Sequence, residues 1–182
     1  MDRMTQDTRA EAIAPPRDSG RPHSDPRPEG ALSRDEWGAH LRSRGLRVTQ
    51  QRLAVLTALH EQGHLLADEV SRAVRTGGGR AADMSLQSVY VVLGDLERTG
   101  LVRKVDLGTG GALFETRVGD NHHHAICRVC GFVEDVPCAV GRTPCLDPGA
   151  TSIRVDTAEV VFRGVCSTCA ASDSNNLGVK ND

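Results

Sequence analysis

Apolar residues between positions 33 and 100 recur at the three- and four-residue spacing of amphipathic helices. The first helix is predicted to begin at Ser33, where Glu36 completes a capping box, and to end before Gly45. The same spacing predicts three further helices: one capped by Thr49, one over Ala67–Arg75, and one from the cap Ser85 to Gly100. This part of the chain is therefore expected to be helical.

Two strand-like segments follow the helices. Leu101–Val105 and Ala112–Glu115 flank a glycine-rich turn at Gly108–Gly111, which is the pattern of a β-hairpin. Several helices followed by a hairpin make a winged helix-turn-helix, a fold that places one helix in the major groove of DNA. The first half of the chain is therefore predicted to bind DNA.

The rest of the chain contains only short apolar segments. Strands are predicted at Ala125–Cys127, Gly131–Val136 and Glu159–Gly164, in a small mixed α/β unit. This unit has too few apolar residues for a self-sufficient core, so we expect it to depend on a metal or a partner subunit.

These patterns predict an α+β fold and divide the 182 residues into four parts. Residues 1–32 are rich in proline and charge and are expected to be disordered. Residues 33–116 form the winged helix-turn-helix domain, and residues 117–169 form the small α/β domain. Residues 170–182 are polar and are expected to be a flexible tail.

Charge is unevenly distributed, although the net charge is only −2. Residues 33–105 hold 11 basic and 8 acidic residues, whereas residues 106–182 hold 6 and 10. DNA phosphates would therefore favour the first segment. No apolar run is long enough for a membrane helix, and the N-terminus has no signal-peptide core. We expect a cytoplasmic location, where thiols stay reduced.

Four of the six cysteines form two C-x-x-C pairs, Cys127/Cys130 and Cys166/Cys169. This spacing lets both thiolates of a pair turn toward one ion, and four thiolates about 2.3 Å from Zn²⁺ close a tetrahedral site. We expect a structural zinc that stabilises the C-terminal half. A redox-active disulfide and reduced thiols without metal are the alternatives.

Three consecutive histidines precede the first cysteine pair. In a strand, His122 and His124 point to one side and His123 to the other. Glu115 on the preceding strand and Asp135 on the following strand add carboxylates. Mixed imidazole and carboxylate ligands suit Fe²⁺, Mn²⁺ or Zn²⁺, so we predict a second metal site here. A solvated loop is the alternative.

Cys138 and Cys145 lie apart from both pairs, each beside a proline. They are interpreted as apolar fillers or surface thiols, and an auxiliary thiol switch is the alternative.

The motifs of residues 41–169 resemble those of the ferric uptake regulator family. The most specific are HHHAICRVCG at His122–Gly131 and GVCSTC at Gly164–Cys169. The segments Pro137–Gly141 and Pro144–Leu146 resemble the FurA/CatR-type peroxide-responsive branch. The other matching segments are GLRVTQQR at Gly45–Arg52, Ser88–Tyr90 with Leu93, Gly100–Val102 and Phe114-Glu115.

The resemblance implies an N-terminal winged helix, a C-terminal dimerisation domain with a structural zinc, and a regulatory metal between the domains. Since His64 lies in the DNA-binding domain, such a metal would clamp one domain against the other. A further metal site of many members is expected to be absent, because Arg142 and Ala158 stand at its positions. The regulatory ligands of the family map onto His64, Glu115, His122, His124 and Asp135.

Four residues are expected to contact DNA. Ser88 and Tyr90, on the helix from Ser85 to Arg98, would lie near base edges, and Arg47 and Arg52 would contact phosphate or the minor groove. Tyr90 as a core residue and Arg52 as part of a solvated helix face are the alternatives. Many members have Tyr-Arg where this chain has Tyr90-Val91, which puts the usual operator sequence in doubt.

These features predict a homodimeric, metal-dependent, peroxide-responsive repressor that binds a pseudo-palindromic double-stranded DNA operator. Its cofactors would be a structural Zn²⁺ and a regulatory Fe²⁺ or Mn²⁺, and its targets oxidative-stress (catalase-type) or iron-homeostasis genes. A zinc- or iron-uptake repressor of the same fold is the nearest alternative. A thiol oxidoreductase or zinc hydrolase is a distant one. No enzyme is expected, because the histidine cluster has no evident nucleophile.

Overall fold

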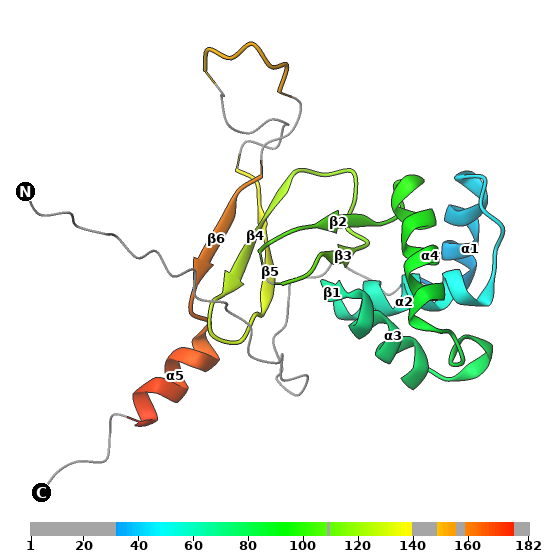
Figure 1. Cartoon of the computed structure of the whole chain (residues 1–182), viewed down its shortest axis with the longest axis horizontal. Helices are drawn as coiled ribbons and strands as arrows, with labels where there is room; N and C mark the ends of the chain where they lie inside the picture. Colours follow the sequence, from blue (N-terminus) through cyan, green and yellow to red (C-terminus); the bar gives the residue numbers. More distant parts are fainter. Residues whose placement is uncertain (1–31, 109, 140–148, 156–158, 177–182) are drawn as a thin grey trace, which may run out of the picture.

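The computed structural model describes residues 32–108, 110–139, 149–155 and 159–176. The expectations for residues 1–31 and 177–182, and those for Arg142, Cys145 and Ala158, fall outside these ranges. Figure 1 shows the helical region on one side, a second sheet on the other, and a small sheet between them. None of the helices in the described ranges has the length and apolar character needed to cross a membrane.

The four predicted helices are all present, with boundaries close to those expected. The capping box of the first is confirmed: Ser33 Oγ accepts from the Glu36 N–H, and the Ser33 N–H donates to Glu36 Oε2 at 2.7 Å. Thr49 and Ser85 cap their helices through their side-chain oxygens. The helices are α1 (Arg34–Ser43), α2 (Gln50–Gln62), α3 (Ala67–Thr76) and α4 (Leu86–Arg98), with a 3₁₀ turn at Gly79–Ala81.

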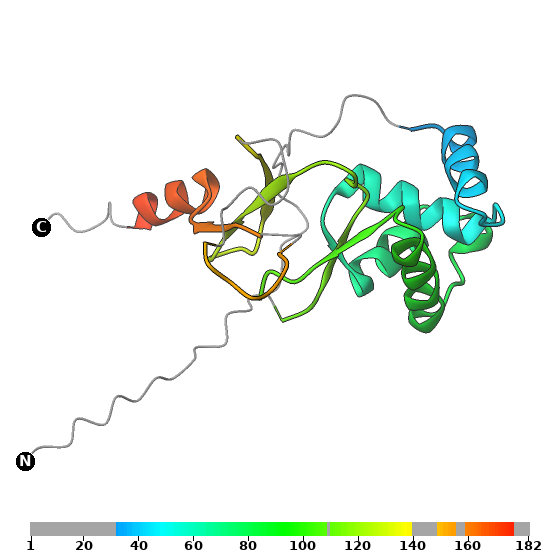
Figure 2. The same ribbon diagram turned by 90° about the horizontal axis from the view of Figure 1, so that it is seen from above.

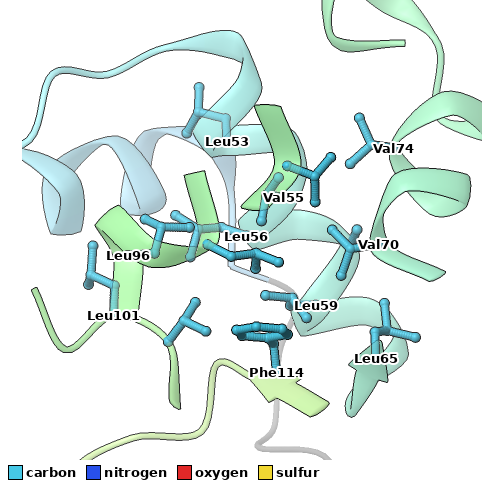
Figure 3. Close-up of a cluster of buried hydrophobic side chains, with 14 of the residues drawn as sticks. Leu53, Val55, Leu56, Leu59, Leu65, Val70, Val74, Leu96, Leu101 and Phe114 are labelled. Atoms are coloured by element: carbon cyan, nitrogen blue, oxygen red, sulfur yellow. The ribbon is translucent and has the colours of Figure 1, made fainter. Parts of the chain in front are cut away.

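The inward faces of these helices form one hydrophobic core. Figure 3 shows Phe114, from the strand that follows the helices, packed with Leu56 and Leu59 of α2. Burial of each such side chain contributes roughly 1.5–3 kcal/mol. Other members of this core are Leu41, Val55, Val70, Val89, Leu93 and Leu96.

A three-stranded sheet joins the helical core to the rest of the molecule. The predicted hairpin is confirmed as β2 (Arg103–Val105) and β3 (Leu113–Glu115). A third strand, β1 (Leu65–Leu66), pairs with β3 and was not expected from the sequence. Strand β1 begins shortly after Gly63, the residue at which α2 ends. Gly63 has a φ of 76°, a conformation that favours glycine.

The second sheet has the order β5-β4-β6. The central strand β4 (His122–Cys127) pairs antiparallel with β5 (Val133–Pro137) and parallel with β6 (Val161–Gly164). All three strands overlap the predicted ones, and β4 begins three residues earlier than predicted. This confirms the mixed α+β architecture.

Helix α5 (Ser167–Asn176) leaves the end of this sheet and extends away from it in both views (Figures 1 and 2). The segment expected to be a flexible tail from residue 170 is thus helical as far as Asn176. The segment lacks the apolar spacing that marks a helix, and its start is set by the second cysteine pair. There, the Ala170 N–H donates to the Cys166 carbonyl at 2.9 Å.

The hairpin packs against the second sheet through a small apolar cluster. Val105, Leu107 and Leu113 of the hairpin region meet Ile126 of β4 and Val133 of β5. Beside this cluster, a guanidinium N–H of Arg163 on β6 donates to the Leu107 carbonyl at 2.7 Å. The two sheets are thus in direct contact, and the division into domains at residues 116 and 117 stays a prediction.

Candidate metal centres

The two cysteine pairs come together at one end of the second sheet. The parallel register of β4 and β6 sets Cys127 opposite Gly164, two residues before Cys166. All four sulfurs lie within 4.8 Å of one another, and the sulfurs of Cys130 and Cys166 are 3.8 Å apart. A tetrahedron with Zn–S bonds of about 2.3 Å has edges of about 3.8 Å. The arrangement therefore fits the predicted zinc site.

Hydrogen bonds and crowding give these thiols unequal acidity. Burial raises the pKa of Cys127, but backbone N–H groups of Cys130 and Cys166 donate to its sulfur and lower that pKa to about 6. Burial and the neighbouring Cys166 and Cys130 raise the pKa of Cys169 to about 12. Four thiolates would repel one another strongly here unless a cation lay between them. None of the cysteines in the described ranges forms a disulfide.

A second cluster lies between the two sheets. His64, Glu115, His124 and Asp135 each offer a ligand atom within 4.8 Å of the others, and all four residues are buried. Nε2 of His122 lies 3.3 Å from Glu115 Oε2 and 3.6 Å from Asp135 Oδ1, so this residue borders the same cluster. The five residues predicted as regulatory ligands are thus brought together.

Strand register explains how these residues meet. The pairing of Leu65 with Phe114 brings His64, the residue before β1, beside Glu115 on β3. In the second sheet, His124 and Asp135 are direct cross-strand partners. Residue-by-residue reasoning missed His64, which only the family resemblance supplied, because two-residue strands such as β1 have no detectable periodicity.

The two carboxylates in this cluster are ionised. Nε2 of His64 lies 2.9 Å from Glu115 Oε2 and 3.1 Å from Asp135 Oδ1. Burial lowers the pKa of His64, but the hydrogen bonds to Asp135 and Glu115 outweigh it and raise this pKa to about 9. Burial raises the pKa of Glu115, yet the close imidazoles of His122, His124 and His64 keep it well below its usual range. Two buried carboxylates are costly unless cations face them, so this donor set fits a divalent metal.

Neighbouring side chains orient the histidines. Oδ1 of Asp120, which can only accept, lies 3.0 Å from Nδ1 of His122, and Nε2 of the same ring faces the cluster. Arg117 bridges Asp120 and Asp135, at 2.7 and 3.0 Å. The sequence analysis had not singled out Arg117 or Asp120.

Arg103 also reaches the cluster, and the sequence analysis missed it. It is the cross-strand partner of Glu115 on β2, and its Nε donates to Glu115 Oε1 at 2.6 Å. Its Nη2 lies 3.0 Å from His122 Nε2 and 3.3 Å from His124 Nε2. A cationic side chain therefore touches three of the candidate ligands.

The remaining residues near these clusters point elsewhere. His123 lies on the other side of β4, as its alternation predicted, with its ring 6.4 Å from that of Phe162. Cys138 is half-buried, and its sulfur accepts from Asn121 Nδ2 at 3.2 Å.

Helix α4 presents a largely exposed face. Tyr90 is 51% exposed and Ser88 is also exposed, so Tyr90 does not belong to the core. Arg47 is exposed before α2. Arg52 instead forms an ion pair with Asp95 of α4 at 2.7 Å and donates to the Arg47 carbonyl. Arg52 is thus not simply part of a solvated helix face, and its contact with phosphate stays a prediction.

Comparisons with known proteins agree with this picture. Residues 43–139 match the Ferric uptake regulator family. The transcriptional regulator FurA of Mycobacterium tuberculosis is 43% identical over 141 residues, which cover 77% of this chain and 94% of the relative. Ferric uptake regulation protein 1 of Mycolicibacterium fortuitum is 48% identical over 123 residues, which cover 67% and 74%.

Solved structures show the same fold. The ferric uptake regulator of Vibrio cholerae aligns with a TM-score of 0.54 at 22% identity, over 71% of this chain and 98% of that one. The ferric uptake regulator of Pseudomonas aeruginosa, solved with manganese, aligns with a TM-score of 0.50 at 25% identity, over 71% and 97%. These alignments confirm the predicted fold class.

Proposed function

The chain belongs to the ferric uptake regulator family, and we propose that it is a metal-dependent, peroxide-responsive repressor that binds operator DNA as a homodimer. Its curated relatives are named as transcriptional regulators or ferric uptake regulation proteins rather than as enzymes, in agreement with the expectation that it is not an enzyme. Oxidative-stress (catalase-type) or iron-homeostasis genes are the proposed targets.

The observation that carries this proposal is the buried cluster between the two sheets. Its histidines and carboxylates come from the segment after α2, from β3, and from β4 and β5. Fe²⁺ or Mn²⁺ would be held by residues on both sides of this contact, so metal binding would favour one relative arrangement of the helical region and the second sheet. The cysteine cluster would hold a structural Zn²⁺ and keep the second sheet folded.

DNA binding is assigned to the helical region. α4 would enter the major groove with Ser88 and Tyr90 near base edges, and Arg47 would contact a phosphate. The ion pair from Arg52 to Asp95 fixes α4 against α2, so Arg52 supports this face even if it also reaches DNA. In a homodimer, two such helices would read the half-sites of a pseudo-palindrome.

The histidines also account for a response to peroxide. Bound Fe²⁺ would supply the redox chemistry by which peroxide oxidises a neighbouring imidazole. His64, His122 and His124 are the imidazoles of this site, and none of the described cysteines belongs to it. An oxidised imidazole ligates poorly, so the link between the two regions would weaken and the DNA would be released.

The variant His64→Ala tests the regulatory site. DNA selected by the wild-type protein from a random pool in Mn²⁺ serves as the operator, and affinity is measured with and without Mn²⁺. The variant should keep its zinc and its dimer but lose Mn²⁺ activation by roughly 5- to 150-fold, the usual range of coupling between sites. His40→Ala, at an exposed histidine of α1, is the matched control. Full Mn²⁺ activation in the His64 variant would refute the assignment.

Mass spectrometry separates the peroxide-responsive repressor from a metal-uptake repressor of the same fold. Protein loaded with Fe²⁺ should gain oxygen on His64, His122 or His124 after peroxide, and Mn²⁺ should protect it. Oxidation confined to Cys138 or Cys145 during DNA release would assign sensing to a thiol. DNA release only on metal removal would favour an uptake repressor.

A further inference from the structure

Arg103 occupies a defined place beside the regulatory cluster. The order β1-β3-β2 sets it on the far side of Glu115 from His64, so the carboxylate lies between an imidazole and a guanidinium. The Arg103 side chain is 33% exposed, whereas that of Glu115 is 2% exposed. The guanidinium therefore reaches a buried cluster from its solvent side.

The atoms that Arg103 contacts are those that a metal would need. Arginine has only N–H donors, so Nε2 of His122 must accept from Arg103 Nη2 with its lone pair. In the tautomer with the proton on Nδ1 beside Asp120, Nε2 has the one lone pair that coordination needs, and Arg103 already contacts it. One lone pair cannot bind a guanidinium N–H and a metal ion together.

The positive charge of Arg103 also opposes metal binding. Guanidinium stays protonated under all ordinary conditions, so Arg103 supplies a permanent positive charge beside Glu115. A divalent cation bound to Glu115 and His124 would lie close to this charge and be repelled by it. Its partial exposure gives Arg103 a route into solvent, where its charge is readily solvated.

We propose that Arg103 is an internal competitor for the regulatory metal: its guanidinium occupies the ligand atoms of Glu115, His122 and His124, and it must withdraw before the metal binds. This inference rests on the proposed function of the cluster. Arg103 thereby raises the metal concentration at which the protein responds. It also holds β2 to β4 until the metal takes its place.

The variant Arg103→Met tests the competition, because methionine keeps part of the apolar stem and removes the cation. Mn²⁺ affinity is measured on the zinc-loaded dimer from the electron paramagnetic resonance signal of free Mn²⁺. The dissociation constant should fall roughly 10- to 100-fold, as expected from losing a charge-assisted hydrogen bond that competes with the metal. Arg103→Lys, which keeps a charge but not the forked contacts, should give an intermediate value.

Lys104→Met is the matched control. Lys104 is the next residue on β2, carries the same charge, is exposed, and by strand alternation points to the opposite face of the sheet from Arg103. It should leave Mn²⁺ affinity within about twofold of wild type, since screened surface charges have little effect. Retained zinc in each variant reports that the fold is intact.

Three results would contradict the inference. Unchanged or weaker Mn²⁺ binding in both Arg103 variants would show that the guanidinium does not compete. An equal gain in Mn²⁺ affinity in Lys104→Met would show that the effect comes from net charge alone. Mn²⁺ binding that His64→Ala leaves intact would refute the regulatory site itself, and the competition with it.

Discussion

At the scale of single residues, buried side chains with charge or metal-binding chemistry set the properties of this protein. Burial opposes ionisation of Glu115 and Asp135, but His122, His124 and His64 hold the pKa of Glu115 below its usual range, and His64 does the same for Asp135. In the cysteine cluster, burial and the neighbouring thiols raise the pKa of Cys169, so the last thiols to ionise lose their protons with difficulty. A cation would therefore stabilise both clusters, and removing one ligand should affect more than one contact.

Cys169→Ser should remove the structural zinc and unfold the C-terminal half together. Cys169 is buried between the other three thiols, and three remaining ligands leave the tetrahedral site open. Zinc content and thermal unfolding are measured on the same samples. Cys138→Ser, at a thiol outside the cluster, should retain zinc and stability. A folded dimer of Cys169→Ser with full zinc would show that the four-thiolate site is not structural.

At the scale of secondary-structure elements, α4 serves two purposes. Val89, Leu93 and Leu96 face the core and are at most 1% exposed, whereas Tyr90 and Val91 face solvent. An apolar face that fixes the helix and an open face that can read base edges are what a recognition helix requires. The ion pair between Arg52 and Asp95 also links α2 to α4.

Tyr90→Ala and Arg47→Ala should weaken DNA binding in different ways. Loss of Tyr90 should erode discrimination between selected and random DNA, because a base-edge contact carries sequence information. Loss of Arg47 should weaken binding to both DNAs and reduce the slope of log affinity against log salt by about 1. Fluorescence anisotropy over a salt series measures both effects. Equal losses on both DNAs for Tyr90→Ala would place Tyr90 on the backbone instead.

At the scale of the whole molecule, the proposed signal would reach the DNA-binding region through the contact between the two sheets. That contact contains the apolar cluster around Leu113 and Ile126, the hydrogen bond from Arg163 to Leu107, and the candidate regulatory site. The apolar part would hold the regions together without metal, while the charged part would change on metal binding. This combination suits a protein whose regions must stay connected in two states.

Hydrogen exchange should report this change. Addition of Mn²⁺ to the zinc-loaded dimer should slow exchange in peptides that cover residues 63–66 and 133–137, because candidate ligands lie within these segments or directly beside them. Peptides from α1, which holds none of these ligands, serve as the internal control. Protection that is equal in α1 and in both segments would indicate general stabilisation rather than a link between the two sheets.

The sequence by itself determined the features that depend on neighbouring residues. Capping residues and three- to four-residue spacing placed the four helices, glycine-rich turns and alternation placed the hairpin, and C-x-x-C spacing indicated zinc. These signals extend over a few positions, so they can be recognised before the fold is known. The family resemblance supplied His64, which no local pattern indicated.

Only the tertiary structure decided which distant residues meet. β1 and the place of Arg103 beside Glu115 follow from strand register, and the Arg52–Asp95 pair joins positions 43 residues apart. Helix α5 likewise begins where the second cysteine pair closes the sheet, rather than where its own sequence favours a helix. Local periodicity does not reveal such contacts, because they form only when sheets and helices pack together. That packing also places the Arg103 guanidinium against the ligands of the candidate regulatory site.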